Sequence, residues 1–187
     1  MKNDDGFATI ALRLIESPNA KARENGRFLF RSLRSASPPE AIPDLIRVLE
    51  SPHGDTASFA AAVLGNLTWP SSDATEALVY TLYNSPSSST REGAAEALVR
   101  HGRNNPLVST ALVDALTDRN RLVRDSARRS LEAIDFDLRS AIPGLRKIAK
   151  HHGGFEIRSI AKELADSLES PPPAPARNPA PTPHARP

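Results

Sequence analysis

An internal repeat of 33 or 34 residues constrains this chain more than any other feature of its sequence. A small-residue column recurs at spacings of 34, 34, 33 and 34, and consists of Gly26, Ala60, Ala94, Ala127 and Ala161. An apolar column in the same register consists of Ala11, Leu45, Val79, Leu112 and Leu145. The residues four positions after the small-residue column are Phe30, Leu64, Leu98, Leu131 and Ala165. The residues four positions after the apolar column are Ile15, Leu49, Tyr83, Leu116 and Ala149. A period of this length is typical of stacked helical repeats.

The spacing of apolar residues within each unit is helical. In the second unit, Ile42, Leu45 and Leu49 share one face of a first helix, and Ala60 and Leu64 begin the same pattern in a second helix. Turn-forming residues separate the two helices, and no run of four or more residues alternates in the manner of a strand. The sequence therefore predicts five helix pairs, which cover residues 5–35, 39–69, 72–103, 106–136 and 138–169.

These pairs predict an all-α fold, an α-solenoid. A single helix pair cannot bury its own apolar face, so the core must form where successive pairs stack. Gly or Ala in the small-residue column lets the second helix of each unit approach its neighbour closely. Aromatic residues make up only 5% of the chain, which suits thin layers of Leu, Ile, Val and Ala.

The C-terminal segment differs from the repeats in composition. Residues 170–187 hold 8 of the 17 prolines, together with Arg177, Arg186 and no acid, so we predict a disordered Pro/Ala-rich tail. Residues 172–177 match the P-x-x-P-x-R pattern of SH3 ligands, although a spacer is the favoured interpretation. The tail carries the whole excess charge, because residues 1–169 hold 22 basic and 22 acidic residues.

Composition excludes several classes of protein. The chain has no Cys, which rules out disulfides, thiolate metal sites and Cys nucleophiles. No apolar run approaches the roughly 18 residues of a membrane helix, and the polar start MKNDDG does not resemble a secretory signal. We therefore expect a soluble, cytoplasmic protein.

The second helices carry a pattern that resembles HEAT repeats, in particular the short bacterial type first described in phycobilin lyases. The pattern is seen in residues 122–127 (LVRDSA) with Leu131, and again in residues 90–95 (TREGAA) with Leu98. The resemblance covers about 165 residues and implies a right-handed superhelix whose second helices line a concave face. It implies protein binding more often than catalysis.

An arginine column precedes the small-residue column by three residues, and consists of Arg23, Arg91, Arg124 and Arg158, with Ala57 in the second unit. These side chains could form an anion-binding stripe. The favoured interpretation is structural, because the five N–H donors of an arginine can bind carbonyls and acids of the adjoining turn.

Charge is distributed unevenly along the repeats. Residues 36–118 hold 10 acids and 4 bases, whereas residues 119–158 hold 10 bases and 5 acids. The densest basic group comprises Arg119, Arg121, Arg124, Arg128 and Arg129. A basic surface of this kind suits a phosphate backbone, so nucleic-acid binding through the fourth and fifth repeats, as in the HEAT-like alkylpurine glycosylases, is the first alternative.

Signs of catalysis or metal binding are weak. His151 and His152 are adjacent and have no acid at a chelating spacing, and no His-Glu dipeptide exists, which excludes the di-iron chemistry of deoxyhypusine hydroxylase. Nucleophile and phosphate-loop motifs are absent. We expect no enzyme activity, no cofactor and no metal. A phycobilin-lyase-like or other HEAT-repeat enzyme accessory role, with Trp69, Tyr80 and Tyr83 near a pocket, is the second alternative.

The favoured hypothesis is a monomeric, non-catalytic scaffold that binds a protein partner on its concave second-helix face. The expected contact residues are Arg27, Arg31, Ser58, Glu92, Glu96, Arg124, Arg128 and Lys162. On this hypothesis, Arg124→Glu combined with Arg128→Glu weakens binding without unfolding the chain.

Overall fold

The computed structural model describes residues 10–11, 13–32, 42–67, 71–103, 105–134 and 138–169, except for the side chains of residues 30–32. Helices are the only regular secondary structure in these ranges. Residues 10–11 and 13–15 are helical and precede α2 (Ala20–Ser32). The remaining helices are α3 (Ile42–Leu49), α4 (Gly54–Gly65), α5 (Ser72–Asn84), α6 (Ser88–Ala97), η2 (Leu98–His101), α7 (Pro106–Ala115), α8 (Arg121–Ala133), η3 (Arg139–Ala141), α9 (Ile142–His151) and α10 (Phe155–Glu169).

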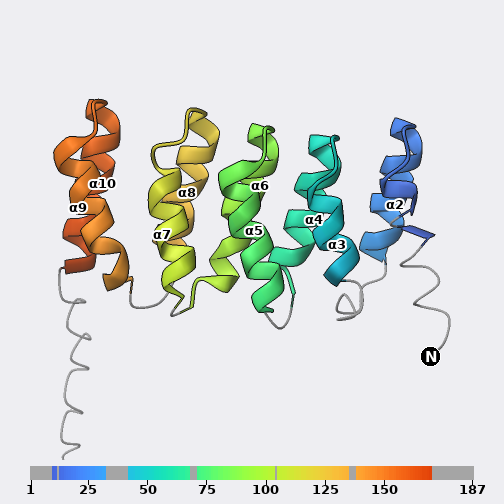
Figure 1. The fold of residues 1–187 in the computed structure, drawn as a ribbon, viewed down its shortest axis with the longest axis horizontal. Coiled ribbons are helices and arrows are strands. Elements are labelled where there is room, and N and C mark those ends of the chain that lie inside the picture. The colour runs from blue at the N-terminus through green and yellow to red at the C-terminus, as the bar shows by residue number, and fades with distance from the viewer. Residues whose placement is uncertain are drawn as a thin grey trace, which may run out of the picture.

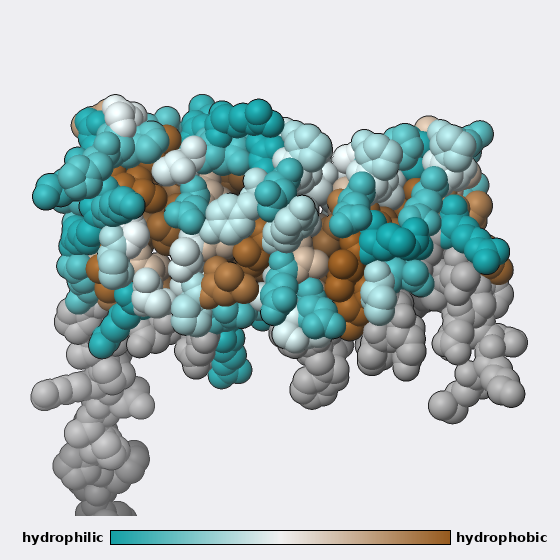
Figure 2. All heavy atoms as spheres, viewed as in Figure 1, coloured by the Kyte–Doolittle hydropathy of each residue, from teal (hydrophilic) through white to brown (hydrophobic). Residues whose placement is uncertain are grey.

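The helix pairs stand side by side in one row (Figure 1). First helices contact first helices, because α5 packs on both α3 and α7, and α7 also packs on α9. Second helices likewise contact second helices, because α6 lies between α4 and α8, whereas α10 packs chiefly on α9. The array therefore has two layers, a first-helix layer and a second-helix layer. Figure 2 shows a face on which hydrophilic residues predominate, with apolar patches visible between them along the row.

The repeated columns form the core. All five members of the small-residue column and all five members of the apolar column are buried. Among the residues four positions after these columns, Tyr83 is an exception, because it is 49% exposed. Its hydroxyl donates a hydrogen bond of 2.8 Å to Asp114, in the next repeat. Partial burial and this carboxylate raise the pKa of Tyr83 to about 12. Tyr83 thus joins α5 to α7 at the surface rather than filling the core.

The arginine column holds the turns within the pairs. Each arginine donates from Nη1 to the two carbonyl oxygens that lie six and five residues earlier in the chain. The acceptors are Ser17 and Pro18 for Arg23, Ser85 and Pro86 for Arg91, Asp118 and Arg119 for Arg124, and His152 and Gly153 for Arg158. These contacts are the structural ones that the sequence favoured. Ala57 cannot make them, so the turn of the second unit lacks this support.

Arg91 also links two repeats. Its Nε and Nη2 donate to the two carboxylate oxygens of Asp118 at 2.8 and 3.0 Å, and the two side chains are only 5% and 13% exposed. Burial raises the pKa of Asp118, but hydrogen bonds from Arg91 and from the backbone of Asn120 outweigh it, so the pKa lies below its usual value. The pair is therefore ionised and buried at the junction between the third and fourth units.

Glycines mark the closest helix contacts. A Cβ at Gly26 would lie 2.7 Å from the carbonyl oxygen of Ala11 and from the amide nitrogen of Ile15. The small residue at this position therefore allows the close approach that the sequence predicted, and the neighbour is the first helix of the same pair. Contact between units depends on Gly65 in α4, where a Cβ would lie 2.5 Å from the Cα of Ala97 in α6.

Some predicted features lie outside the described residues. They are the C-terminal tail at residues 170–187, Trp69, and the side chains of Phe30 and Arg31. Within the part of the chain that the structure describes, no helix combines the length and the apolar character needed to cross a membrane.

His101 joins three elements in the interior. The ring is only 4% exposed, its Nε2 lies 3.2 Å from the carbonyl oxygen of Leu64 in α4, and its Nδ1 lies 2.7 Å from the hydroxyl of Thr75 in α5. A carbonyl only accepts, so Nε2 carries the proton in the neutral ring, and the single hydroxyl hydrogen of Thr75 is shared between Nδ1 and the carbonyl oxygen of Ser71, which lies 2.8 Å away. Burial lowers the pKa of His101 below its ordinary value of 6.5, and the Leu64 carbonyl partly opposes this effect.

Because His101 is buried, we predict that the free energy of unfolding depends on pH in the acid range. Below the ordinary pKa of 6.5 the unfolded chain binds a proton at His101 that the folded chain does not, so the free energy of unfolding falls as pH decreases. Urea unfolding between about pH 7.5 and about pH 5 measures the slope. His101→Gln keeps a donor for the Leu64 carbonyl and should flatten it. An unchanged slope in that variant would assign the effect to other groups.

Candidate functional site: a groove between α4 and α6

An open groove of about 410 Å³ runs between α4 and α6 on the second-helix layer. We call it the α4–α6 groove. The residues that line it are Ser58, Ala62, Gly65, Asn66, Ser89, Glu92, Gly93, Glu96, Ala97, Val99 and Arg100. The sequence selected second-helix residues as contact positions, and three of those residues, Ser58, Glu92 and Glu96, line this one groove.

Small residues create the groove. Gly65 of α4 and Ala97 of α6 let the two helices approach closely at one end, because neither has a side chain long enough to separate them. Toward the other end, a Cβ at Gly93 would lie 3.5 Å from Ser58, which is an ordinary contact distance. Ala62 adds only a methyl group. Short side chains along both helices therefore leave space above the contact that larger ones would fill.

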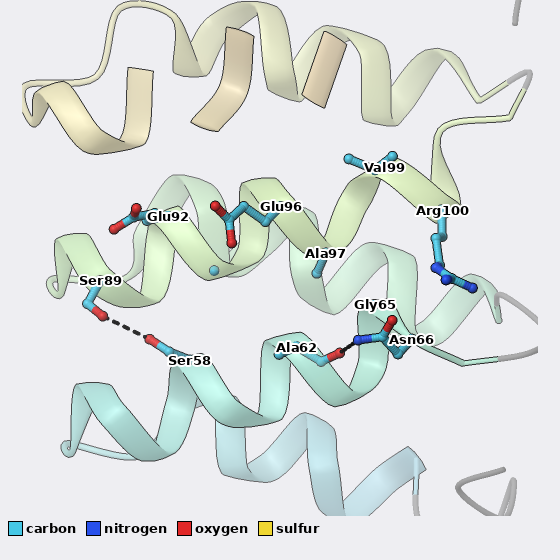
Figure 3. Close-up of a pocket in the computed structure, with 11 residues that line it drawn as sticks. Ser58, Ala62, Gly65, Asn66, Ser89, Glu92, Glu96, Ala97, Val99 and Arg100 are labelled. Carbon is cyan, nitrogen blue, oxygen red and sulfur yellow. Dashed lines mark hydrogen bonds between the residues drawn. The ribbon is translucent and has the colours of Figure 1, made fainter. Parts of the chain in front are cut away.

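Polar groups stand along the groove, as Figure 3 shows. The hydroxyls of Ser58 and Ser89 lie 3.1 Å apart and bridge the two helices at one end. At the other end, Asn66 donates from Nδ2 to the carbonyl oxygen of Ala62 at 2.8 Å, near Arg100. Hydroxyl, amide and charged groups thus line a surface to which a peptide could hydrogen-bond.

The acidic side of the groove is only partly neutralised. Glu96 accepts hydrogen bonds of 3.3 Å from Arg129 and from Ser126, both on α8. Glu92 is half-buried and makes no hydrogen bond or ion pair within the described residues. Its carboxylate projects from α6 on the same side as that of Glu96 (Figure 3). Arg100, at the far end, is exposed and also has no partner in the described part of the chain.

The other predicted contact residues lie elsewhere. Arg27 pairs with Asp55 of α4, and Arg128 pairs with Glu132 of its own helix at 3.1 Å. Arg124 is a correction, because its guanidinium donates to the turn carbonyls of Asp118 and Arg119 instead of pointing outward. Lys162 is exposed on α10, away from the groove.

Sequence reasoning missed several lining residues. Arg129, not Arg124 or Arg128, is the α8 arginine that reaches the groove, through Glu96. Ser89 and Arg100 were also missed. The groove could have been found from the pair of small residues spaced three or four apart on each helix, Ala62 with Gly65 and Gly93 with Ala97. Residues at this spacing share one face of a helix, so one face of α4 and one face of α6 lack long side chains.

Acids offset much of the basic charge in the fourth and fifth units. Arg121 lies 3.6 Å from Asp125, and Arg128 pairs with Glu132 as above. Arg146 pairs with both Asp166 and Glu169 of α10 at 2.7 and 2.5 Å. Lys147 and Lys150 of α9 are exposed and make no ion pair with the described residues. Lys162 of α10 is likewise exposed and makes no ion pair with the described residues, so the remaining free charge in this region lies on both helix layers.

The paired histidines belong to a turn. His152 accepts from the backbone N–H of Gly154 at 3.0 Å through Nδ1, and its carbonyl accepts from Arg158. Across the described ranges, no three His, Asp or Glu side chains gather closely enough to hold a metal ion. Tyr80 and Tyr83 are exposed on α5 and do not line the α4–α6 groove.

Comparison with known proteins agrees with this architecture. A family model described as HEAT repeats matches residues 42–132, which run from α3 into α8 and include the whole groove. Over these residues the match agrees with the resemblance to HEAT repeats that the sequence carries. A search of curated proteins found no match to the chain. HEAT repeats commonly mediate protein–protein interactions.

Proposed function

We propose that this chain, whose residues 42–132 match HEAT repeats, is a non-catalytic scaffold that binds a protein partner on its second-helix layer. The observation that carries the proposal is the α4–α6 groove, in which the half-buried carboxylate of Glu92 has no partner among the described residues. A partly desolvated charge is a strong anchor for an oppositely charged group of a partner.

The form of the groove supports a peptide or protein ligand. It is open along its length and is lined by hydroxyl, amide and carboxylate groups with small residues between them. Short side chains permit close approach of a partner backbone, while Ser58, Ser89 and Asn66 offer hydrogen bonds. The neighbouring repeats extend the same layer, so contacts can continue from α4 and α6 onto α8.

Photo-cross-linking tests this proposal. A photoreactive phenylalanine analogue placed at Ala62 lies in the groove, and the same analogue at Tyr80 lies on the exposed face of the first-helix layer. We expect one protein to be cross-linked from position 62 in cell extract and not from position 80. Cross-linking from position 80 alone, or from neither position, would contradict the proposal.

The nucleic-acid alternative depends on Lys147 and Lys150 of α9 and Lys162 of α10, which are exposed bases of the fifth unit without an ion-pair partner among the described residues. Because acids offset the arginines around them, we expect weak binding to duplex DNA that disappears at physiological salt. A salt titration by fluorescence anisotropy measures it. Submicromolar binding with a steep salt dependence would favour this alternative.

For the accessory-enzyme alternative, purification with a bound chromophore or metal would be the supporting result, and we expect neither.

A further inference from the structure

We infer that the α4–α6 groove binds an extended segment of its protein partner in which a basic and an acidic side chain stand about four residues apart. The inference rests on the proposed function, because it uses the same groove. It adds the chemistry and the spacing by which the groove recognises that partner.

The groove carries opposite charges toward its two ends. Its charged lining residues are Glu92 and Glu96 of α6 and Arg100 of η2, and its other lining residues are uncharged. Arg129 already pairs with Glu96 at 3.3 Å, whereas Glu92 and Arg100 make no ion pair with any described residue. A partner complements this pattern when it brings a cation to Glu92 and an anion to Arg100.

The distance between the two free charges sets the spacing in the partner. Arg100 comes eight residues after Glu92; six of these steps run along α6 to Leu98, where η2 begins. The rise of the α-helical and 3-10 steps together is about 13 Å. Four residues of an extended chain also advance about 13 Å. Residues i and i+4 of such a chain point to the same side, so one segment presents both charges to the groove.

The groove is too narrow for a helix, because α4 and α6 touch along its floor. A Cβ at Gly65 would lie 2.5 Å from the Cα of Ala97, and a Cβ at Gly93 would lie 3.5 Å from Ser58. A helix with its side chains is about 10 Å across, which is wider than the space between two helices in contact. The middle residue of the extended segment also points to this floor, so its side chain must be short.

Peptide display on the full chain tests the inference. A random library of peptides of about 12 residues holds the charge pair in either extended or helical form. We expect the selected peptides to carry Lys or Arg about four residues from Asp or Glu. Either order is allowed, because the order sets only the direction of binding. Selection on Glu92→Gln should lose the basic residue from this pattern, and selection on Arg100→Gln should lose the acidic residue.

Two control variants remove the same charges outside the groove. Glu76→Gln on α5 and Lys162→Gln on α10 change exposed residues that do not line it, and should leave the selected pattern unchanged. Fluorescence anisotropy then measures one selected peptide. Glu92→Gln should weaken its binding about fivefold or more, and much less once the basic residue of the peptide is alanine, because both changes remove the same interaction.

Three outcomes would overturn the inference: no enriched peptides, enrichment without a charge pair at this spacing, or a pattern that Glu92→Gln and Arg100→Gln leave unchanged. A pair about seven or eight residues apart, as on one face of a helix, would overturn the extended form. Cross-linking from position 62 tests the proposed function separately, because it captures a partner of any composition. A cross-linked partner together with one of these outcomes would overturn the inference and leave the proposed function standing.

Discussion

Replacing Arg91 by methionine should lower the free energy of unfolding by about 3–5 kcal/mol, the usual cost of removing one partner of a buried ion pair. The variant leaves the carboxylate of Asp118 without its two donors and the carbonyls of Ser85 and Pro86 without their guanidinium contact. Methionine retains most of the aliphatic part of the arginine side chain, so the loss in the free energy of unfolding measures the contribution of the polar contacts. Urea unfolding followed by circular dichroism measures it.

Arg128→Met is the matched control. Its partner Glu132 lies one turn along the same helix, and both side chains are more than 40% exposed. Exposed pairs of this kind contribute at most a few tenths of a kcal/mol. Equal losses for the two variants would show that Arg91 does not stabilise the junction between the third and fourth units in the way its contacts indicate.

Replacing Gly65 by leucine should be the second most damaging change, with a loss of about 1–3 kcal/mol or more from overpacking. Any Cβ at this position would lie 2.5 Å from the Cα of Ala97, and the nearest atoms include backbone that cannot swing aside. α4 and α6 would be forced apart, and the leucine side chain would also enter the groove. Thermal and urea unfolding measure the loss.

Gly153→Ala separates this effect from the general consequence of removing a glycine. A Cβ at Gly153 would meet nothing within 4 Å. The expected effect is therefore neutral or a gain of a few tenths of a kcal/mol, because alanine restricts the unfolded chain. A Gly65→Leu variant as stable as Gly153→Ala would contradict the close contact between α4 and α6.

The sequence predicted the core well because the repeat supplies several independent copies of each position. One unit shows that Leu45 and Leu49 are spaced as in a helix, but the buried face is identified by finding Leu112 and Leu116 at the same positions two units later. The same copies revealed the arginine column, and its contacts with turn carbonyls follow from the five donors of arginine at a fixed distance from the turn.

The groove could not be predicted in the same way, because it depends on how far α4 and α6 stand apart. That distance is set by Gly65 and Ala97, and neither residue belongs to a repeated column. Helical periodicity also cannot distinguish the directions of long side chains. Arg124 and Arg129 both lie on α8, yet the first turns back to Asp118 while the second reaches Glu96. Tyr83 sits in an apolar column but reaches Asp114 at the surface, because its hydroxyl needs a partner.

The most direct test of the central claim is the affinity of the partner cross-linked from position 62, measured by isothermal titration calorimetry. The account predicts that Glu92→Lys combined with Glu96→Lys weakens binding at least tenfold, or about 1.4 kcal/mol, because the charge that anchors the partner is reversed. Asp73→Lys combined with Glu76→Lys, the same charge change on α5, should leave the affinity within about twofold, as expected for a charge outside the interface. Unchanged affinity for the groove variant, or equal loss for both, would contradict the claim that the partner binds the α4–α6 groove.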